Sequence, residues 1–117
     1  MKLNFPKIVR PVDLGEYAET WGGQSVFVWV NPPSKDLVDI GDLYKQSQEK
    51  DGDKAGEKYL ALFSSFLSQG EPDTHFNVED LENIEKATKE TDPAFWMWLQ
   101  TRVIVEINEH RLGRKKA

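Results

Sequence analysis

The sequence predicts an α+β fold that is mainly α, with a short β-strand or hairpin near the N-terminus followed by about four helices. Two observations predict this class. The segment QSVFVWVNPP, residues 24–33, is rich in β-branched and aromatic residues and ends in two prolines, as strands do. From residue 34 onwards, apolar residues recur at helical spacing between glycine- and proline-containing turns. A strand-first, helices-after order is typical of α+β chains.

Length and composition indicate one domain over residues 1–117. We expect an extended or β segment at 1–33, a helical part at 34–112 and a basic tail at 113–117. The net charge of -5 argues against a nucleic-acid partner, because phosphate binding needs a clustered basic surface. The chain has no cysteine, which excludes disulfides and cysteine zinc sites. Without a long apolar run or a signal peptide, we expect a cytoplasmic protein with no membrane partner.

The N-terminal region is expected to hold one strand or two. Pro6 and Pro11 bracket KIVR, which predicts a short edge strand, since proline is tolerated at strand ends and edges. In the second strand, valines alternate with Phe27 and Trp29, so both faces are apolar and a strand covered on both sides is predicted. Phe27 and Trp29 either pack in the core or leave a sheet face or edge open to a partner.

Four helices are expected after the proline pair. Ser34 is the predicted N-cap of the first, and the second spans roughly 54–69. The third follows Asn77 as N-cap and has a thin apolar stripe, which indicates a surface position. The last begins at Asp92 as N-cap, with Pro93 in the first helical position.

The last helix, within residues 91–111, is apolar on two sides. At about 100° per residue, its core stripe consists of Phe95, Trp96, Leu99, Val103 and Ile107. Trp98, Val105 and Leu112 lie nearly opposite this stripe, with Met97 at the edge of the second group. Such a helix is either sandwiched inside the domain or half-covered and open to a partner. Either the N-terminal segment or the strand covers Trp98, or this second side forms an oligomer or partner interface.

The sequence holds no recognisable constellation for catalysis. It has no His-Glu-x-x-His pattern, phosphate-binding loop or dinucleotide fingerprint. Of its two histidines, His75 precedes a predicted helix, and His110 near a helix end complements the helix dipole. Asp51 and Asp53 lie in a loop that lacks the ligand spacing of an EF-hand. We therefore expect no enzymatic activity, no catalytic residues, no metal and no cofactor.

The opening PVDLGEYAETWGGQSVFVWVNPP, a polar helical middle and the closing TDPAFWMWLQTRVIVEINEHRLGRKK, in this order, resemble the tail assembly chaperones of long-tailed bacteriophages. The resemblance covers most of the chain in layout and includes no diagnostic motif. It implies a mainly helical homo-oligomer in the cytoplasm of an infected or prophage-carrying bacterium. Such a protein coats and solubilises the tape-measure protein and helps to recruit the major tail protein, the subunit of the tail tube.

The family is often made in two lengths by a programmed ribosomal frameshift near the end of the short form. Lys115 and Lys116 are compatible with an adenine run on which ribosomes slip, and equally with an ordinary basic tail. The residues expected to bind the partner are Trp98, Val105, Leu112 and Met97 on the last helix, and Phe27 and Trp29 on the strand as second choice. The alternatives are a structural phage tail or head-tail completion subunit, or a small host-directed regulatory binding protein.

Overall fold

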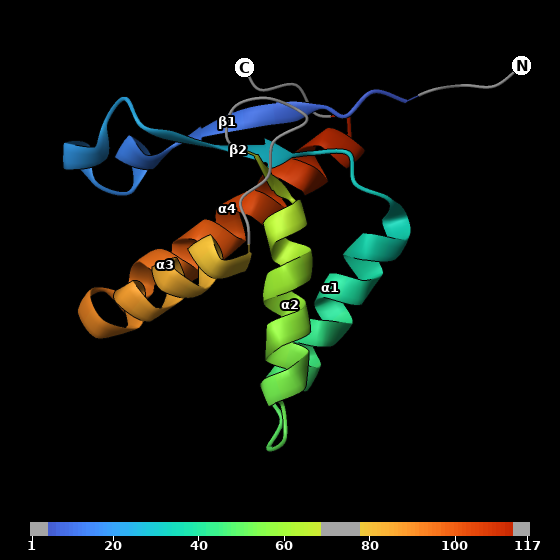
Figure 1. The fold of residues 1–117 in the computed structure, drawn as a ribbon. Helices are drawn as coiled ribbons and strands as arrows, with labels where there is room; N and C mark the ends of the chain where they lie inside the picture. Colours follow the sequence, from blue (N-terminus) through green and yellow to red (C-terminus); the bar gives the residue numbers. More distant parts are fainter. Residues whose placement is uncertain (1–4, 69–77, 114–117) are drawn as a thin grey trace, which may run out of the picture.

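A computed structural model describes residues 5–68 and 78–113. A small sheet lies at one end of the molecule, and the helices extend away from it (Figure 1). The described elements are β1 (Val9–Asp13), β2 (Ser25–Trp29), α1 (Ser34–Ser47), α2 (Asp53–Ser65), β3 (Leu67–Ser68), α3 (Val78–Thr91) and α4 (Pro93–Arg111). The predicted α+β class, mainly α with an N-terminal hairpin and four helices, is confirmed.

The sheet is antiparallel, with strand order β1-β2-β3. The loop between β1 and β2 contains two 3-10 turns, η1 (Leu14–Glu16) and η2 (Glu19–Trp21). Val12 pairs with Val26 in the hairpin, and Phe27 pairs with Ser68 of β3. β3 was not expected from the sequence, which predicted a continuous helical region at this point.

The first strand differs from the expected KIVR segment because it includes Pro11. The N–H of Val30 donates to the carbonyl of Ile8 at 2.9 Å, and hydrogen-bonded pairs alternate with non-hydrogen-bonded pairs along an antiparallel ladder. Pro11, opposite Phe27, therefore occupies a non-hydrogen-bonded pair. An N–H at this position would point to the open edge of the sheet and not to β2, so proline costs the ladder no hydrogen bond.

The two faces of β2 are covered unequally. Val26, Val28 and the following Val30 are buried on the inner face. Phe27 and Trp29 are half-buried on the other face, where the ammonium of Lys7 lies 4.6 Å from the centroid of the Trp29 ring. The sequence predicted that β2 is covered on both faces. The inner face is fully covered, and the outer face is covered only in part.

The helix boundaries show two differences from expectation. The N-cap position of α1 is Pro33, whose carbonyl accepts from the N–H of Asp36 at 3.0 Å, so Ser34 is already helical. The second helix ends at Ser65 and not near residue 69, because the next residues leave the helix and pair with β2. The backbone hydrogen bonds of the sheet here override a helical pattern, as tertiary context commonly does.

The turn between α1 and α2 requires glycine. A Cβ at Gly52 would lie 2.5 Å from the carbonyl oxygen of Ser47 and 2.6 Å from that of Gln46. Both distances are below any ordinary contact, so a side chain would force the turn apart. Gly52 thereby allows α1 and α2 to pack closely as an antiparallel pair.

The sheet and the helices share one core. Its buried apolar members are Val12, Val26, Val28, Val30, Ile40, Leu60, Phe63, Phe66, Leu67, Leu81, Phe95, Trp96, Leu99, Val103 and Ile107. The five residues predicted as the core stripe of the last helix are all among them, which confirms that interpretation. α3 runs beside α4 and buries Leu81 and Thr88, while the predicted cap Asn77 lies outside the described residues (Figure 1). Within the described part of the chain, no helix is long and apolar enough to cross a membrane.

Candidate functional site: the outer side of α4

The most distinctive surface of the molecule is the side of α4 that faces away from the core. Met97 is 54% exposed and Leu112, at the C-cap, is 66% exposed. Ile104 and Val105 lie between them and are half-buried. At about 100° per residue, these four side chains fall within one sector of about 100° and extend about 22 Å along the axis. We call Met97, Ile104, Val105 and Leu112 the outer strip.

The sequence of α4 explains why it can carry this strip. Asp92 occupies the N-cap position and Pro93 the first turn, as predicted, and the helix then continues to Arg111. Apolar residues occur on both sides, so the helix can bury one side in the core and still present the other. Ile104 was not among the expected partner-binding residues, although its position seven residues after Met97 places it on the same side of the helix.

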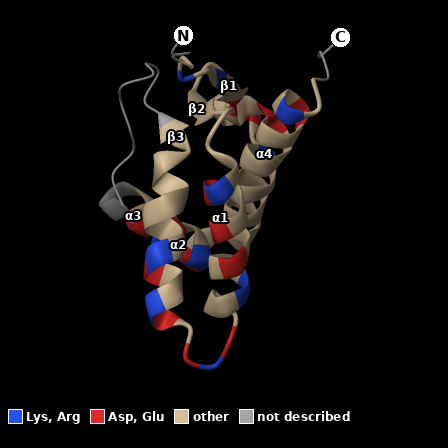
Figure 2. Ribbon diagram, turned by 90° about the vertical axis from the view of Figure 1, so that its right-hand side faces the viewer, with Lys and Arg blue, Asp and Glu red and all other residues tan. Residues whose placement is uncertain are grey.

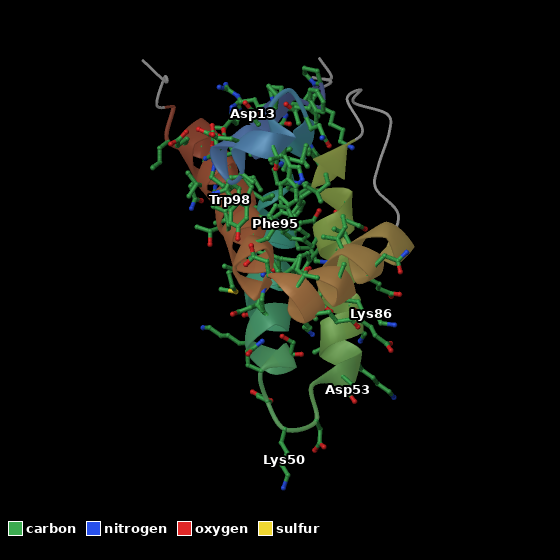
Figure 3. All side chains as sticks on the ribbon, turned by 90° about the vertical axis from the view of Figure 1, so that its left-hand side faces the viewer. Asp13, Lys50, Asp53, Lys86, Phe95 and Trp98 are labelled. Atoms are coloured by element: carbon green, nitrogen blue, oxygen red, sulfur yellow. The ribbon has the colours of Figure 1, made fainter. Side chains whose placement is uncertain are left out.

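Trp98 lies at the border of the strip. The N-terminal segment covers part of its side chain, as expected if the residue packs inside the domain. Its ring centroid is 5.4 Å from that of Tyr17 and 5.9 Å from that of Phe95. Trp21, in η2, approaches the Phe95 ring to 5.1 Å. Figure 3 shows Trp98 and Phe95 next to each other on α4. These four rings form an aromatic cluster, and the part of Trp98 in partner binding stays a prediction.

Polar contacts hold the β1–β2 loop on α4. The hydroxyl of Tyr17 donates to a carboxylate oxygen of Asp92, and this hydrogen bond raises the pKa of Tyr17. Asp92 therefore bonds to the loop, and its side chain makes no capping bond to its own helix. Nearly three turns further along α4, Arg102 pairs with Glu16 of the loop at 3.2 Å. The loop covering Trp98 is thus fixed by two separate side-chain contacts.

Arg102 also pairs with Glu106 at 2.9 Å, one helical turn along α4. Glu106 is 1% exposed, while the Glu16 side chain is 52% exposed. Arg102 therefore joins a buried carboxylate of the helix to an exposed carboxylate of the loop. The arrangement is that of a structural ion-pair network, which holds η1 against α4.

The second predicted surface, Phe27 and Trp29, is separate from the strip and lies on the sheet. Trp29 lines a hollow of about 460 Å³ with Phe5, Lys7 and Asn31 among its other walls. The amide of Asn31 accepts from the N–H of Ile8 at 2.8 Å and donates to the carbonyl of Pro6 at 2.8 Å. The N-terminal segment therefore partly covers this face of the sheet.

Within residues 5–68 and 78–113, no three His, Asp or Glu side chains are grouped so that they could hold a metal ion. His110 is half-buried near the end of α4, and His75 lies outside the described residues. Comparisons of the chain with protein-family models, with curated proteins and with solved structures find no match.

Proposed function

We propose that this protein is a non-enzymatic assembly chaperone that binds an amphipathic helix of another protein along the outer strip of α4. The observation that carries the proposal is the strip itself. Four apolar side chains lie along about 22 Å of one helix side, and two of them are more than half exposed. Exposed apolar side chains gathered on one side of a helix are a feature of protein-interaction surfaces.

The shape of the strip favours a helical partner. Its members recur at helical spacing, so a partner helix with apolar anchors at i, i+3, i+4 and i+7 would meet them along its length. Met97 is flexible and polarizable, which suits a surface that has to fit partners of varied sequence. The net charge of -5 would keep the resulting complex in solution.

The resemblance to tail assembly chaperones supplies the identity of the partner. A tape-measure protein is a long helical chain with exposed apolar stripes, and it needs to be covered until tail tube subunits surround it. In this proposal the protein coats the tape-measure protein in the cytoplasm of the infected bacterium and helps to recruit the major tail protein. A structural tail subunit would use a similar surface but would remain in the finished particle.

Co-expression with the protein encoded just downstream, which this proposal expects to be the tape-measure protein, followed by pull-down and sizing, tests this function. The unmodified chain is expected to yield a soluble complex with several copies of the chaperone. Met97→Asp combined with Leu112→Asp should reduce the recovered complex about tenfold, which corresponds to about 1.4 kcal/mol of binding free energy. Both side chains are mostly exposed, so the thermal midpoint of the free protein should hardly change.

Val38→Asp is the matched control, because Val38 is a 63% exposed apolar residue on α1, outside the strip. This variant should capture the tape-measure protein as well as the unmodified chain. Equal capture by the strip variant and the control would contradict the proposal. Recovery of the protein from purified phage particles would instead favour a structural subunit.

A further inference from the structure

A second surface lies between the helices and shares only Met97 with the outer strip. It is a groove of about 700 Å³, bounded by the end of α1, the first half of α2, the middle and last turn of α3, and the first half of α4. Charged residues gather on the lower parts of α1 and α2 (Figure 2). The side chains that give the groove its chemistry are Tyr44, Asp53, Glu57, Tyr59, Glu82, Glu85, Lys89 and Gln100.

The groove is acidic. Four carboxylates line it against one ammonium, which gives a net charge of -3. Lys89 is already paired with Glu85 at 3.5 Å, one turn away on α3. Asp53 and Glu57 on α2 and Glu82 on α3 are exposed. A cationic segment entering the groove would therefore meet carboxylates on two of its walls.

The groove also has a fixed aromatic wall. Tyr44 is 39% exposed, and the centroid of its ring lies 5.7 Å from that of Tyr59. The hydroxyl of Tyr59 donates to the side-chain oxygen of Gln100 at 2.5 Å, and the amide of Gln100 donates to the carbonyl of Trp96 at 3.2 Å. Burial raises the pKa of Tyr59, so its hydroxyl remains a protonated donor. Aromatic faces beside carboxylates suit a lysine or arginine side chain.

The chain itself contains a basic segment that matches the acidic groove. Residues 111–116, RLGRKK, carry four cations and no acid. Arg111 ends α4, whereas Gln100 in the groove lies about 16 Å nearer the start of the same helix. A chain's own basic segment would have to double back along α4 to enter its own groove. The segment of a second copy has no such restriction.

We propose that the groove binds the basic segment 111–116 of a second copy of this chain. The contact is head-to-tail, since the two copies use different surfaces, and such contacts build rings or open chains. This inference does not depend on the proposed function, because it concerns self-association through carboxylates. Met97 borders both the groove and the outer strip, so the groove is tested through its acidic residues.

A fluorescently labelled peptide of residues 108–117 is the probe, and its anisotropy is measured with the full-length protein at low and high salt. Glu57→Gln combined with Glu82→Gln is expected to weaken peptide binding about tenfold. Glu90→Gln is the matched control, because Glu90 is an exposed acid on α3 that does not line the groove. The Glu90→Gln variant should bind the peptide as tightly as the unmodified protein does. High salt should weaken peptide binding to the unmodified protein.

Sedimentation velocity of the full-length chain provides the second readout. The unmodified chain should form concentration-dependent oligomers. The groove variant and a Lys115→Glu, Lys116→Glu variant should each sediment as smaller species. Equal loss of peptide binding in the groove variant and the control would show nonspecific attraction and overturn the proposal. The proposal would also be overturned if the full-length protein remained monomeric and the peptide did not bind to it. A groove variant that still captures the tape-measure protein separates this inference from the function of the strip.

Discussion

Arg102→Met is expected to lower the free energy of unfolding by about 3 kcal/mol, since a buried carboxylate loses its cationic partner. Arg102 is paired with Glu106 at 2.9 Å, and the Glu106 side chain is 1% exposed. The substitution preserves most of the side-chain volume, so the loss reflects the charge and not a cavity. Urea unfolding followed by tryptophan fluorescence measures the change.

The double variant Arg102→Met, Glu106→Leu is the control for this prediction. Replacing both members of a buried pair by apolar residues is often close to neutral. The double variant should therefore recover most of the lost stability. A single variant as stable as the unmodified protein would show that the buried carboxylate of Glu106 does not depend on Arg102.

Trp98→Ala is expected to lower the free energy of unfolding by about 2 kcal/mol, below the value of about 3–5 kcal/mol typical of fully buried tryptophans. Trp98 is half-buried, and its indole packs against Tyr17 and Phe95. Its removal leaves the β1–β2 loop without part of its support. Thermal and urea unfolding measure the effect.

Met97→Ala is the neighbouring control on the same helix. Met97 is 54% exposed, so its truncation should change stability by no more than about 0.5 kcal/mol. If the two variants were equally stable, Trp98 would not support the loop, and its indole would be free to act as an anchor for a partner.

The sequence predicts the last helix well because its signals are local. Asp92 and Pro93 mark its start, and a long periodic pattern marks its core side. The end of the second helix could not be predicted in the same way. Leu67 pairs with Val28, which is far away in the chain, and this pairing determines where the helix stops. Local propensity carries no information about such a partner.

The candidate surfaces, too, are predictable where local sequence determines them and unpredictable where distant contacts do. Met97, Val105 and Leu112 could be placed on one side of the helix from their spacing. Whether Trp98 is covered depends on the loop at Tyr17, which is 75 residues away from its hydrogen-bond partner Asp92. The acidic groove brings side chains together from all four helices, so no single stretch of sequence reveals it.

One side of α4 lies in the core and the other is open to a partner, and cysteine labelling tests this arrangement most directly. The chain has no cysteine, so one introduced thiol reports one position. Val103 is fully buried and Val105 half-buried, on roughly opposite sides of the helix. We expect the thiol of Val105→Cys to react much faster than that of Val103→Cys in the free protein. We also expect it to become protected in a complex with the proposed partner, the tape-measure protein. Equal rates in the free protein, or no protection in the complex, would contradict the account.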